Sequence, residues 1–250
     1  MGKLNMKILV TGAKGFLGKN LVMKLRSNNY NEILEYNSDS DISLLDQDTR
    51  DCEFVYHLAG VNRPKDQMDF MKVNYGLTDT LLHLLRKNKN PSPIMIASSI
   101  QAEQNNPYGL SKKEAEGLLL QHALETGTTI FIYRFPNVFG KGCRPNYNSV
   151  IATFCYNIAR NLPITVHDPE KELKLVHIDD VSVELLNALM GKENRMDGCL
   201  CKVPAEYPIK LGEIARLLYL FKEAGKPISV PGISDDFIRK LYNTYMSYLP

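Results

Sequence analysis

Apolar and polar residues alternate along the first 135 residues in segments that predict strands and helices in turn. Lys7–Thr11 is a short apolar run that ends at a glycine, which is typical of a buried strand. In Phe16–Arg26 the apolar residues recur at the spacing of one helical face. The pattern continues with strands at Glu32–Tyr36, Phe54–Leu58, Ile94–Ala97 and Thr129–Arg134, and with helices at Lys65–Lys87 and Tyr108–Leu124. Such alternation predicts an α/β fold, a doubly wound parallel sheet covered by helices on both faces.

The second half of the chain is less regular, because glycine and proline interrupt residues 139–146. A strand is predicted at Leu173–Ile178, and we expect it to return to the main sheet. Asp179 is expected to cap the helix that follows this strand. The predicted helices of this half span Ser149–Arg160, Asp179–Met190, Leu211–Lys222 and Asp235–Tyr245.

Composition excludes several classes of protein. Among 250 residues, 44% are hydrophobic and 23% charged, which is ordinary for a globular chain. The net charge of +2 gives no electrostatic reason to expect a nucleic acid or a membrane as partner. No apolar run approaches the roughly 20 residues that span a bilayer. Five cysteines, an odd number in a chain that opens without an apolar secretion signal, predict reduced thiols and a cytoplasmic location.

A glycine-rich turn separates the first predicted strand from the first predicted helix. It has glycines at Gly12, Gly15 and Gly18. Glycines permit a tight turn and let the backbone approach a pyrophosphate, and a helix N-terminus offers unpaired N–H groups and a positive dipole end. This turn predicts dinucleotide binding. The expected contacts are Gly12, Lys14, Gly15, Phe16 and Leu17.

The residues after the second strand bear on which nicotinamide cofactor is bound. In sheets of this type an acidic residue there commonly holds the adenosine ribose, but this chain has Tyr36 and Asn37. Lys14 is placed to face a 2′-phosphate, so NADP(H) is favoured over NAD(H). Glu35 and Asp39 lie close enough that a small shift in alignment would restore an acid.

Tyr108 and Lys112 are one helical turn apart on a predicted helix, so their side chains share a face. A nearby ammonium is expected to lower the pKa of a tyrosine, which suits a proton donor to a nascent alkoxide. Ser99 ends the preceding strand and could bond a substrate carbonyl, whereas Ser98 is interpreted as a turn residue. His57 is interpreted as a histidine of the core or of a strand end.

Together the glycine turn, Leu58-Ala59-Gly60, Ser99, Tyr108-x-x-x-Lys112 and Arg134-Phe135-Pro136-Asn137-Val138-Phe139-Gly140 resemble extended short-chain dehydrogenase/reductases acting on nucleotide sugars. This resemblance implies an NAD(P)-dependent oxidoreductase with a Rossmann sheet. Tyr108 would be the catalytic acid/base, Ser99 would position the keto oxygen, and Lys112 would hold the nicotinamide ribose. Asn74 would support the site. Further cofactor contacts are expected at Tyr36, Asp41, Ile42, Leu58, Ala59, Gly60 and Phe135.

A narrower resemblance rests on Gly60-Val61-Asn62-Arg63-Pro64, on Asn105-Asn106-Pro107-Tyr108-Gly109 and on the run from Arg144 to Asn161. These are similar to the reductase half of bifunctional capsular-polysaccharide enzymes that make UDP-N-acetyl-L-fucosamine. In that family a metal-binding cupin domain epimerises a UDP-4-keto-6-deoxy-N-acetyl sugar, and the reductase then reduces carbon 4 with NADPH. The product is UDP-2-acetamido-2,6-dideoxy-L-talose. Substrate contacts are expected at Asn62, Arg63, Asn137, Arg144, Asn146 and Tyr147.

These observations divide the chain into two predicted domains. Residues 1–140 plus 175–195 form the NAD(P)-binding domain, and residues 141–174 plus 196–250 form a smaller, discontinuous substrate-binding cap. The chain ends about where the cupin would begin, so the cupin is expected outside it, on a longer chain or a separate one. A homodimer stays open, and no metal site is expected.

Two other functions remain open. A 4-epimerase or dehydratase is the nearer alternative, although dehydratases usually follow the active-site hydroxyl residue with an acidic pair, and here Ile100 and Gln101 follow Ser99. Epimerases usually carry the acid after the second strand. A redox sensor that binds NADP without turnover is the other alternative, but such proteins generally lose the tyrosine or the lysine.

Overall fold

The computed structural model describes residues 5–250, so the first four residues of the predicted NAD(P)-binding domain lie outside it. The chain forms two compact units. Unit 1 takes in the chain up to Phe135 together with Ser182–Val203, and unit 2 takes in Pro136–Val181 with Pro204–Pro250. Each unit is therefore built from separate segments of the sequence.

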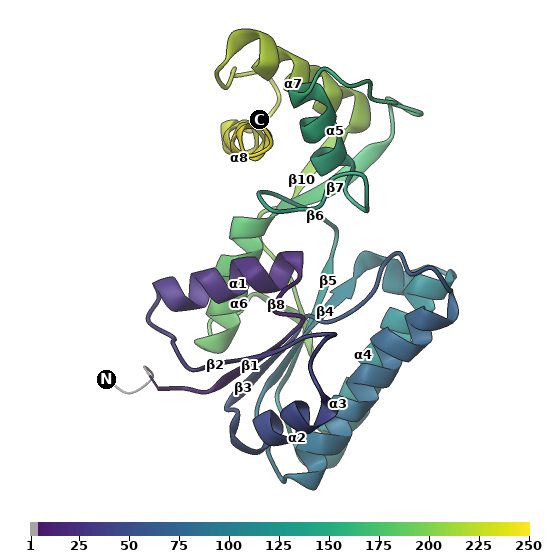
Figure 1. Ribbon diagram of the computed structural model, residues 1–250, viewed down its shortest axis with the longest axis vertical. Helices are drawn as coiled ribbons and strands as arrows, with labels where there is room; N and C mark the ends of the chain where they lie inside the picture. The colour runs from purple at the N-terminus through teal and green to yellow at the C-terminus, as the bar shows by residue number, and fades with distance from the viewer. Residues whose placement is uncertain (1–4) are drawn as a thin grey trace. The chain divides into compact units, whose positions relative to one another are not determined.

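Unit 1 contains a seven-stranded sheet in the order β2-β1-β3-β4-β5-β9-β8 (Figure 1). Its strands are β1 (Ile8–Thr11), β2 (Ile33–Tyr36), β3 (Phe54–His57), β4 (Ile94–Ser99), β5 (Ile130–Phe135), β8 (Arg195–Asp197) and β9 (Leu200–Cys201). All neighbours pair in parallel except β8, which runs antiparallel to β9. The predicted parallel α/β sheet is confirmed.

Helices cover both faces of this sheet, as predicted. One face carries α1 (Phe16–Ser27) and α6 (Ile178–Leu189), and the other carries α2 (Ile42–Asp51), α3 (Gly76–Lys87) and α4 (Pro107–Thr126). Leucines of the second group, among them Leu81, Leu85 and Leu119, pack with the strand residues Val55 and Ile94 in one buried cluster. Removing these apolar side chains from water stabilises the sheet–helix layers by about 2 kcal/mol per leucine.

Unit 2 holds a three-stranded sheet in the order β10-β7-β6. Its strands are β6 (Asn137–Phe139), β7 (Glu172–His177) and β10 (Tyr207–Lys210), and its helices are α5 (Val150–Ala159), α7 (Leu211–Ala224) and α8 (Asp235–Met246). Its core combines Phe139, Phe221, Phe237 and Leu241.

The expectation that the strand at Leu173–Ile178 returns to the main sheet is wrong. This strand, β7, pairs with β6 and β10, and the two-residue strand β9 pairs with β5 instead. The boundaries of the units consequently differ from the predicted ones, and the residues that rejoin unit 1 are Ser182–Val203 rather than 175–195.

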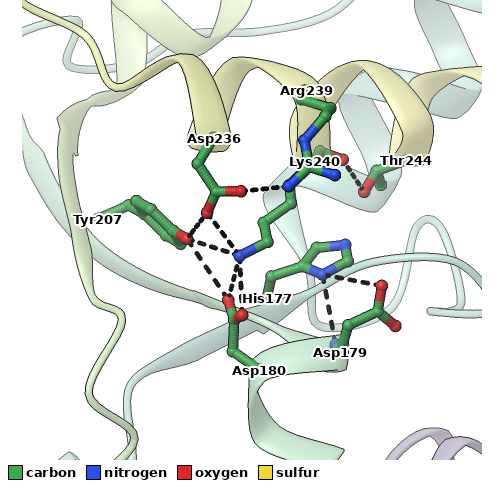
Figure 2. A network of polar contacts seen from close by, with 8 residues as sticks. All are labelled: His177, Asp179, Asp180, Tyr207, Asp236, Arg239, Lys240 and Thr244. Carbon is green, nitrogen blue, oxygen red and sulfur yellow. Dashed lines mark hydrogen bonds and ion pairs between the residues drawn. The ribbon is translucent and has the colours of Figure 1, made fainter. Parts of the chain in front are cut away.

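A cluster of charged side chains in unit 2 joins β10, α6 and α8 (Figure 2). Lys240 Nζ donates to Asp180 at 2.7 and 2.8 Å, to Asp236 at 2.7 Å and to the Tyr207 hydroxyl at 2.8 Å. Burial lowers the pKa of Lys240, but its hydrogen bonds to these three groups outweigh burial and raise it. Lys240 therefore stays charged and ties the first turns of two helices to one strand.

His177 and Asp179 lie beside this cluster. The main-chain N–H of Asp179 donates to His177 Nδ1 at 3.3 Å, and α6 already begins at Ile178. The prediction that Asp179 caps the helix is therefore wrong, because Asp179 occupies the first turn and the imidazole provides the acceptor. Across residues 5–250, no three His, Cys, Asp or Glu residues gather in a way that could hold a metal ion. No helix in the described part of the chain is both long and apolar enough to cross a membrane.

Candidate active site

The glycine turn packs closely against the end of β3. Gly12 has φ +71°, and a Cβ added to it would lie 2.8 Å from the Ala59 backbone. A Cβ on Gly18 would lie 2.2 Å from the carbonyl oxygen of Gly12, so both positions require glycine. Helix α1 follows with Gly15 at its N-cap, without a side-chain cap and without an acidic residue in its first turn. These features leave the helix N-terminus accessible to an anion, and they fit the pyrophosphate of a dinucleotide.

His57 links the end of β3 to the end of β1 and to α3. Its Nδ1 bonds the Thr11 hydroxyl at 2.8 Å, and its Nε2 bonds the Thr78 hydroxyl at 2.9 Å. Burial, and to a smaller extent the charge of Lys112, lowers the pKa of His57 to about 3. The interpretation of His57 as a core, strand-end residue is confirmed. Thr11 also accepts a hydrogen bond from the main chain of Ala59, which holds the loop of Leu58, Ala59 and Gly60.

Lys14 lies at the edge of the turn next to the end of β2. Its main-chain N–H donates to Asn37 Oδ1 at 2.7 Å, and its Nζ pairs with Asp39 at 2.6 Å. Both charged side chains are 64% exposed. An acid thus lies at this edge after all, in contact with the lysine that was expected to face a 2′-phosphate.

The other expected adenosine contacts lie in the same region of unit 1. Tyr36 ends β2 and is buried, and its carbonyl accepts a hydrogen bond from Gly12 at 2.7 Å. Asp41 caps α2 through the main-chain N–H of Ser43 at 2.8 Å, and this bonding lowers the pKa of its carboxyl. Ile42, half-exposed, begins that helix.

Ser99, Tyr108 and Lys112 meet where β4 ends and α4 begins. Ser99 is the last residue of β4, and its hydroxyl bonds the Tyr108 hydroxyl. Lys112 is buried, and its Nζ donates to the carbonyl oxygen of Ala97 at 3.0 Å. Phe135 of β5 lies opposite Ser99 in the sheet register.

The pKa expected for Tyr108 is wrong in direction. Burial raises the pKa of its phenol, and the hydrogen bond to Ser99 offsets this only in part. The Lys112 ammonium does not contribute to this shift in the pKa of Tyr108; its Nζ donates to the carbonyl oxygen of Ala97. Burial also lowers the pKa of Lys112 to about 8, against the opposing influence of Glu116.

Helix α4 begins in a way that fixes Tyr108 beside Ser99. Asn106 caps the helix through the main chain of Gly109 at 2.8 Å, and Pro107 is its first residue. The 3₁₀ turn η2 (Ile100–Glu103) packs so closely on this helix that a Cβ at Gly109 would lie 2.1 Å from the Gln101 carbonyl oxygen. Glycine at this position allows the strand end and the helix to approach each other.

Asn74 lies in a π-helical turn, η1 (Phe70–Tyr75), that interrupts the helix predicted at Lys65–Lys87. It is buried, exchanges hydrogen bonds with the main chain of Val61 at 2.9 and 3.1 Å, and donates to Ser111 at 2.9 Å. A Cβ on Gly60 would lie 2.9 Å from Asn74 Oδ1 and 3.0 Å from Lys112 Nζ. Asn74 therefore links the loop after β3 to α4 at the candidate active site. Wider turns of this kind often mark functional sites.

Two residues of this region were not recognised from the sequence. Ser98 was expected in a turn, yet it lies in β4, is buried, and donates its hydroxyl to Glu116 at 2.5 Å. Glu116 lies four residues after Lys112 on the same helix, so the spacing Tyr108-x-x-x-Lys112-x-x-x-Glu116 was a signal that could have found it.

The family model for the NAD dependent epimerase/dehydratase family matches residues 8–197. The chain belongs to this family. It is 41% identical over 245 residues, 98% of its length, to the UDP-2-acetamido-2,6-beta-L-arabino-hexul-4-ose reductase of Pseudomonas aeruginosa. It is also 28% identical over 226 residues to a putative UDP-glucose 4-epimerase of Methanocaldococcus jannaschii, with 74% of each chain covered.

Solved structures agree with this family membership. The capsular polysaccharide assembling protein CapF of Staphylococcus aureus matches with a TM-score of 0.88, at 45% identity, over 98% of this chain and 66% of that one. RMD of Pseudomonas aeruginosa, solved with NADPH, shares the fold with a TM-score of 0.77 at 21% identity, with 99% of each chain covered. The chain spans 65% of the length of the reductase from Pseudomonas aeruginosa.

The expected substrate residues of this family member are divided between the units. Asn62 and Arg63 are exposed in the loop after β3, in unit 1. Asn137, in β6 of unit 2, donates to the Lys174 carbonyl at 3.4 Å. In unit 2 the guanidinium of Arg144 lies 5.3 Å from the ring centroid of Tyr147. Asn146 lies between them with φ +54°. The role of these residues in binding substrate stays a prediction.

Proposed function

We propose that this chain uses NADPH to reduce the 4-keto group of a UDP-4-keto-6-deoxy-N-acetylhexosamine. The product would be of the UDP-2-acetamido-2,6-dideoxy-L-talose type, for surface polysaccharide biosynthesis. The observation that carries this proposal is the hydroxyl pair of Ser99 and Tyr108 beside the buried ammonium of Lys112, at the carboxyl edge of a parallel sheet. The activity named for the reductase relative of Pseudomonas aeruginosa supports the choice of substrate.

The side chains fit a proton donor and an oxyanion site. Because burial raises the pKa of Tyr108, its phenol is protonated at neutral pH and can give a proton to a ketone oxygen as that oxygen gains negative charge. The Ser99 hydroxyl would donate a hydrogen bond to the same oxygen. Lys112 places a positive charge nearby and would hold the nicotinamide ribose. Bound NADPH supplies the hydride for carbon 4.

The residues around the nucleotide site support a dinucleotide and favour NADP(H) over NAD(H). Gly12, Gly15 and the first turn of α1 would hold the pyrophosphate, and Lys14 would face the 2′-phosphate. The proposed contacts of the sugar nucleotide are Asn62, Arg63, Asn137, Arg144, Asn146 and Tyr147. A cupin epimerase, on a longer chain or a separate one, would supply the substrate, and a homodimer is compatible with this scheme.

Two features favour reduction over the alternatives. Ser99 is followed by Ile100 and Gln101 in η2, so the acidic pair that usually follows the active-site hydroxyl residue of dehydratases is missing at these positions. Asn37, rather than an acid, follows β2 directly, whereas epimerases of this type usually carry an acid there. The retained Tyr108 and Lys112 argue against a sensor without turnover.

The test is a spectroscopic assay with a matched variant. Purified protein is mixed with NADPH and a UDP-4-keto-6-deoxy-N-acetylhexosamine, and loss of nicotinamide absorbance is followed. We expect turnover, and we expect Tyr108→Phe to lose it by at least about 100-fold, because the proton donor is removed. NADPH affinity, measured by fluorescence titration, should stay close to that of the natural protein. Full activity in Tyr108→Phe would contradict the assignment, and tightly bound NAD without oxidation of NADPH would favour an epimerase.

A further inference from the structure

A buried carboxylate lies next to the proposed catalytic residues and has no part in the mechanism above. Glu116 is only 3% exposed, on the face of α4 that also carries Lys112. An ionised carboxylate in such a place is unfavourable unless it is paired and hydrogen-bonded. The partners of Glu116 therefore indicate what keeps it there.

Arg134 of β5 provides the pairing. Its Nε donates to the two oxygens of Glu116 at 2.9 and 3.2 Å, and its Nη2 donates to Oε2 at 2.6 Å. Its Nη1 donates to Glu103 of η2 at 2.8 Å. A guanidinium fork on a carboxylate fixes the orientation of both groups. Arg134 therefore holds Glu116 in one position from the neighbouring strand.

Glu116 and Lys112 both form hydrogen bonds with the end of β4. Lys112 Nζ bonds the carbonyl of Ala97, and the Ser98 hydroxyl donates to Glu116 Oε1 at 2.5 Å. Two successive strand residues are thus held by two side chains one helical turn apart, and the next residue is Ser99. This arrangement sets the separation of strand and helix at the point where Ser99 meets Tyr108.

Glu116 also provides a negative charge that favours the protonated form of Lys112. Burial lowers the pKa of Lys112 to about 8, and Glu116 opposes that change. The other ionisable groups on the surrounding elements are His57 of β3, Tyr108 of α4, Arg134 of β5 and Glu103 of η2. Burial keeps His57 and Tyr108 uncharged at neutral pH, and Arg134 carries the same charge as the lysine.

We propose that Glu116, oriented by Arg134, is a positioning residue that keeps Lys112 charged and fixes the Ser98–Ser99 strand end against α4. This inference rests on the proposed reductase function for its effect on turnover. Its effect on Lys112 does not depend on that function. The two parts are therefore measured separately.

The direct test follows the titration of Lys112 by NMR of isotope-labelled lysine, in the natural protein and in Glu116→Gln. The Lys112 signal is assigned by its loss in Lys112→Arg. Because the variant loses an opposite charge, we expect the Lys112 titration to move to lower pH by about one unit. Glu114→Gln is the matched control: it makes the same chemical change on an exposed position of α4, and it should leave the titration in place.

The consequence for catalysis is measured by the pH dependence of kcat. In Glu116→Gln the alkaline limb should move to lower pH with Lys112, and kcat at neutral pH should fall by about tenfold as the hydroxyl pair loosens. Glu116→Asp keeps the negative charge on a shorter side chain. It should therefore restore the position of the alkaline limb more fully than the value of kcat at neutral pH. Ser98→Ala should lower kcat and leave the limb unmoved.

The outcomes separate this inference from the proposed function. An unchanged Lys112 titration in folded Glu116→Gln, checked by circular dichroism, would overturn the inference, even if the natural protein reduces the keto sugar. A shifted titration in a protein that shows no turnover would keep the charge role and reject the function. If Glu116→Gln does not fold, the inference is tested with Glu116→Asp and Ser98→Ala. It would be overturned if both variants had the same kcat, and the same alkaline limb in its pH dependence, as the natural protein.

Discussion

At the scale of the residue, Lys14 and Asp39 are the pair on which the choice of cofactor is expected to depend. They lie 2.6 Å apart at the edge of the glycine turn, and both are exposed. A 2′-phosphate reaching Lys14 would have to compete with the Asp39 carboxylate and would be repelled by it. NADH carries no such phosphate, so its binding would be affected neither by competition for Lys14 nor by repulsion from Asp39.

Asp39→Asn is therefore expected to favour NADPH further. An exposed ion pair contributes up to about 1 kcal/mol, so the KM for NADPH should fall by roughly three-fold while that for NADH stays nearly constant. Lys14→Ala should raise the KM for NADPH. Steady-state kinetics with both cofactors measures the ratio, and an equal gain for NADH would show that Lys14 does not contact the phosphate.

Sequence patterns could predict the site residues that are recognised from their near neighbours in the sequence. They could not predict the residues whose partners are far away in the sequence. The spacing of Tyr108 and Lys112, and the place of Ser99 at a strand end, can be read within a few residues, and the structure brings the three together. Ser98 pairs with Glu116 and Glu116 with Arg134, at separations of 18 residues that only the folded sheet reveals. The raised pKa of Tyr108 follows from burial, which spacing alone does not show.

At the scale of the element, the periodicity of apolar residues predicts where a strand or helix lies. It predicts less well which other elements that strand or helix contacts. The segment of β7 was expected as a strand and is one, but its partners are β6 and β10, and the partner of β5 is the two-residue β9. Cys199 and Cys201 alternate as in a strand, but so short a pattern does not show which strand it pairs with. Helix α2 was not predicted, and the π turn holding Asn74 departs from a helical spacing that the sequence otherwise keeps.

The charged cluster of unit 2 allows a prediction about the stability of its elements. Lys240, 13% exposed, is surrounded by Asp180, Asp236 and Tyr207. Lys240→Met keeps the apolar stem but removes the cation from Asp180 and leaves Asp236 paired with Arg239 alone, so the free energy of unfolding should fall by about 2 kcal/mol. Denaturant unfolding followed by circular dichroism measures this change. Lys222→Met, at an exposed lysine, is the control.

The same cluster predicts the direction of a pH effect. Hydrogen bonds from Lys240 and Tyr207 lower the pKa of Asp236 below its unfolded value. Its contribution to stability is therefore present above the unfolded pKa and is lost as the pH falls toward the lowered value. The natural protein should lose more stability in acid than Lys240→Met does. Equal losses would assign the acid sensitivity to other carboxylates.

At the scale of the whole molecule, the two units should respond to different ligands. NADPH is expected to slow amide hydrogen exchange in unit 1, at residues 11–18 and 58–60, by up to about 100-fold at a concentration 100 times its Kd. UDP, used as the probe for the sugar nucleotide, should slow exchange at residues 144–147 of unit 2. Mass-spectrometric exchange with each ligand alone measures both effects. Protection by NADPH centred on α8 would contradict this division.

The path of the chain between the units has a consequence for how such a protein can be rearranged. The chain passes from one unit to the other after Phe135, after Val181 and after Val203, and the second of these passages lies within α6. No single break in the gene therefore releases either unit, and a simple fusion cannot transplant one. Exchange of unit 2 between relatives would need three matched recombination joints, one at each of these passages. Substrate preference in this architecture is therefore expected to diverge by substitution in place rather than by shuffling of modules.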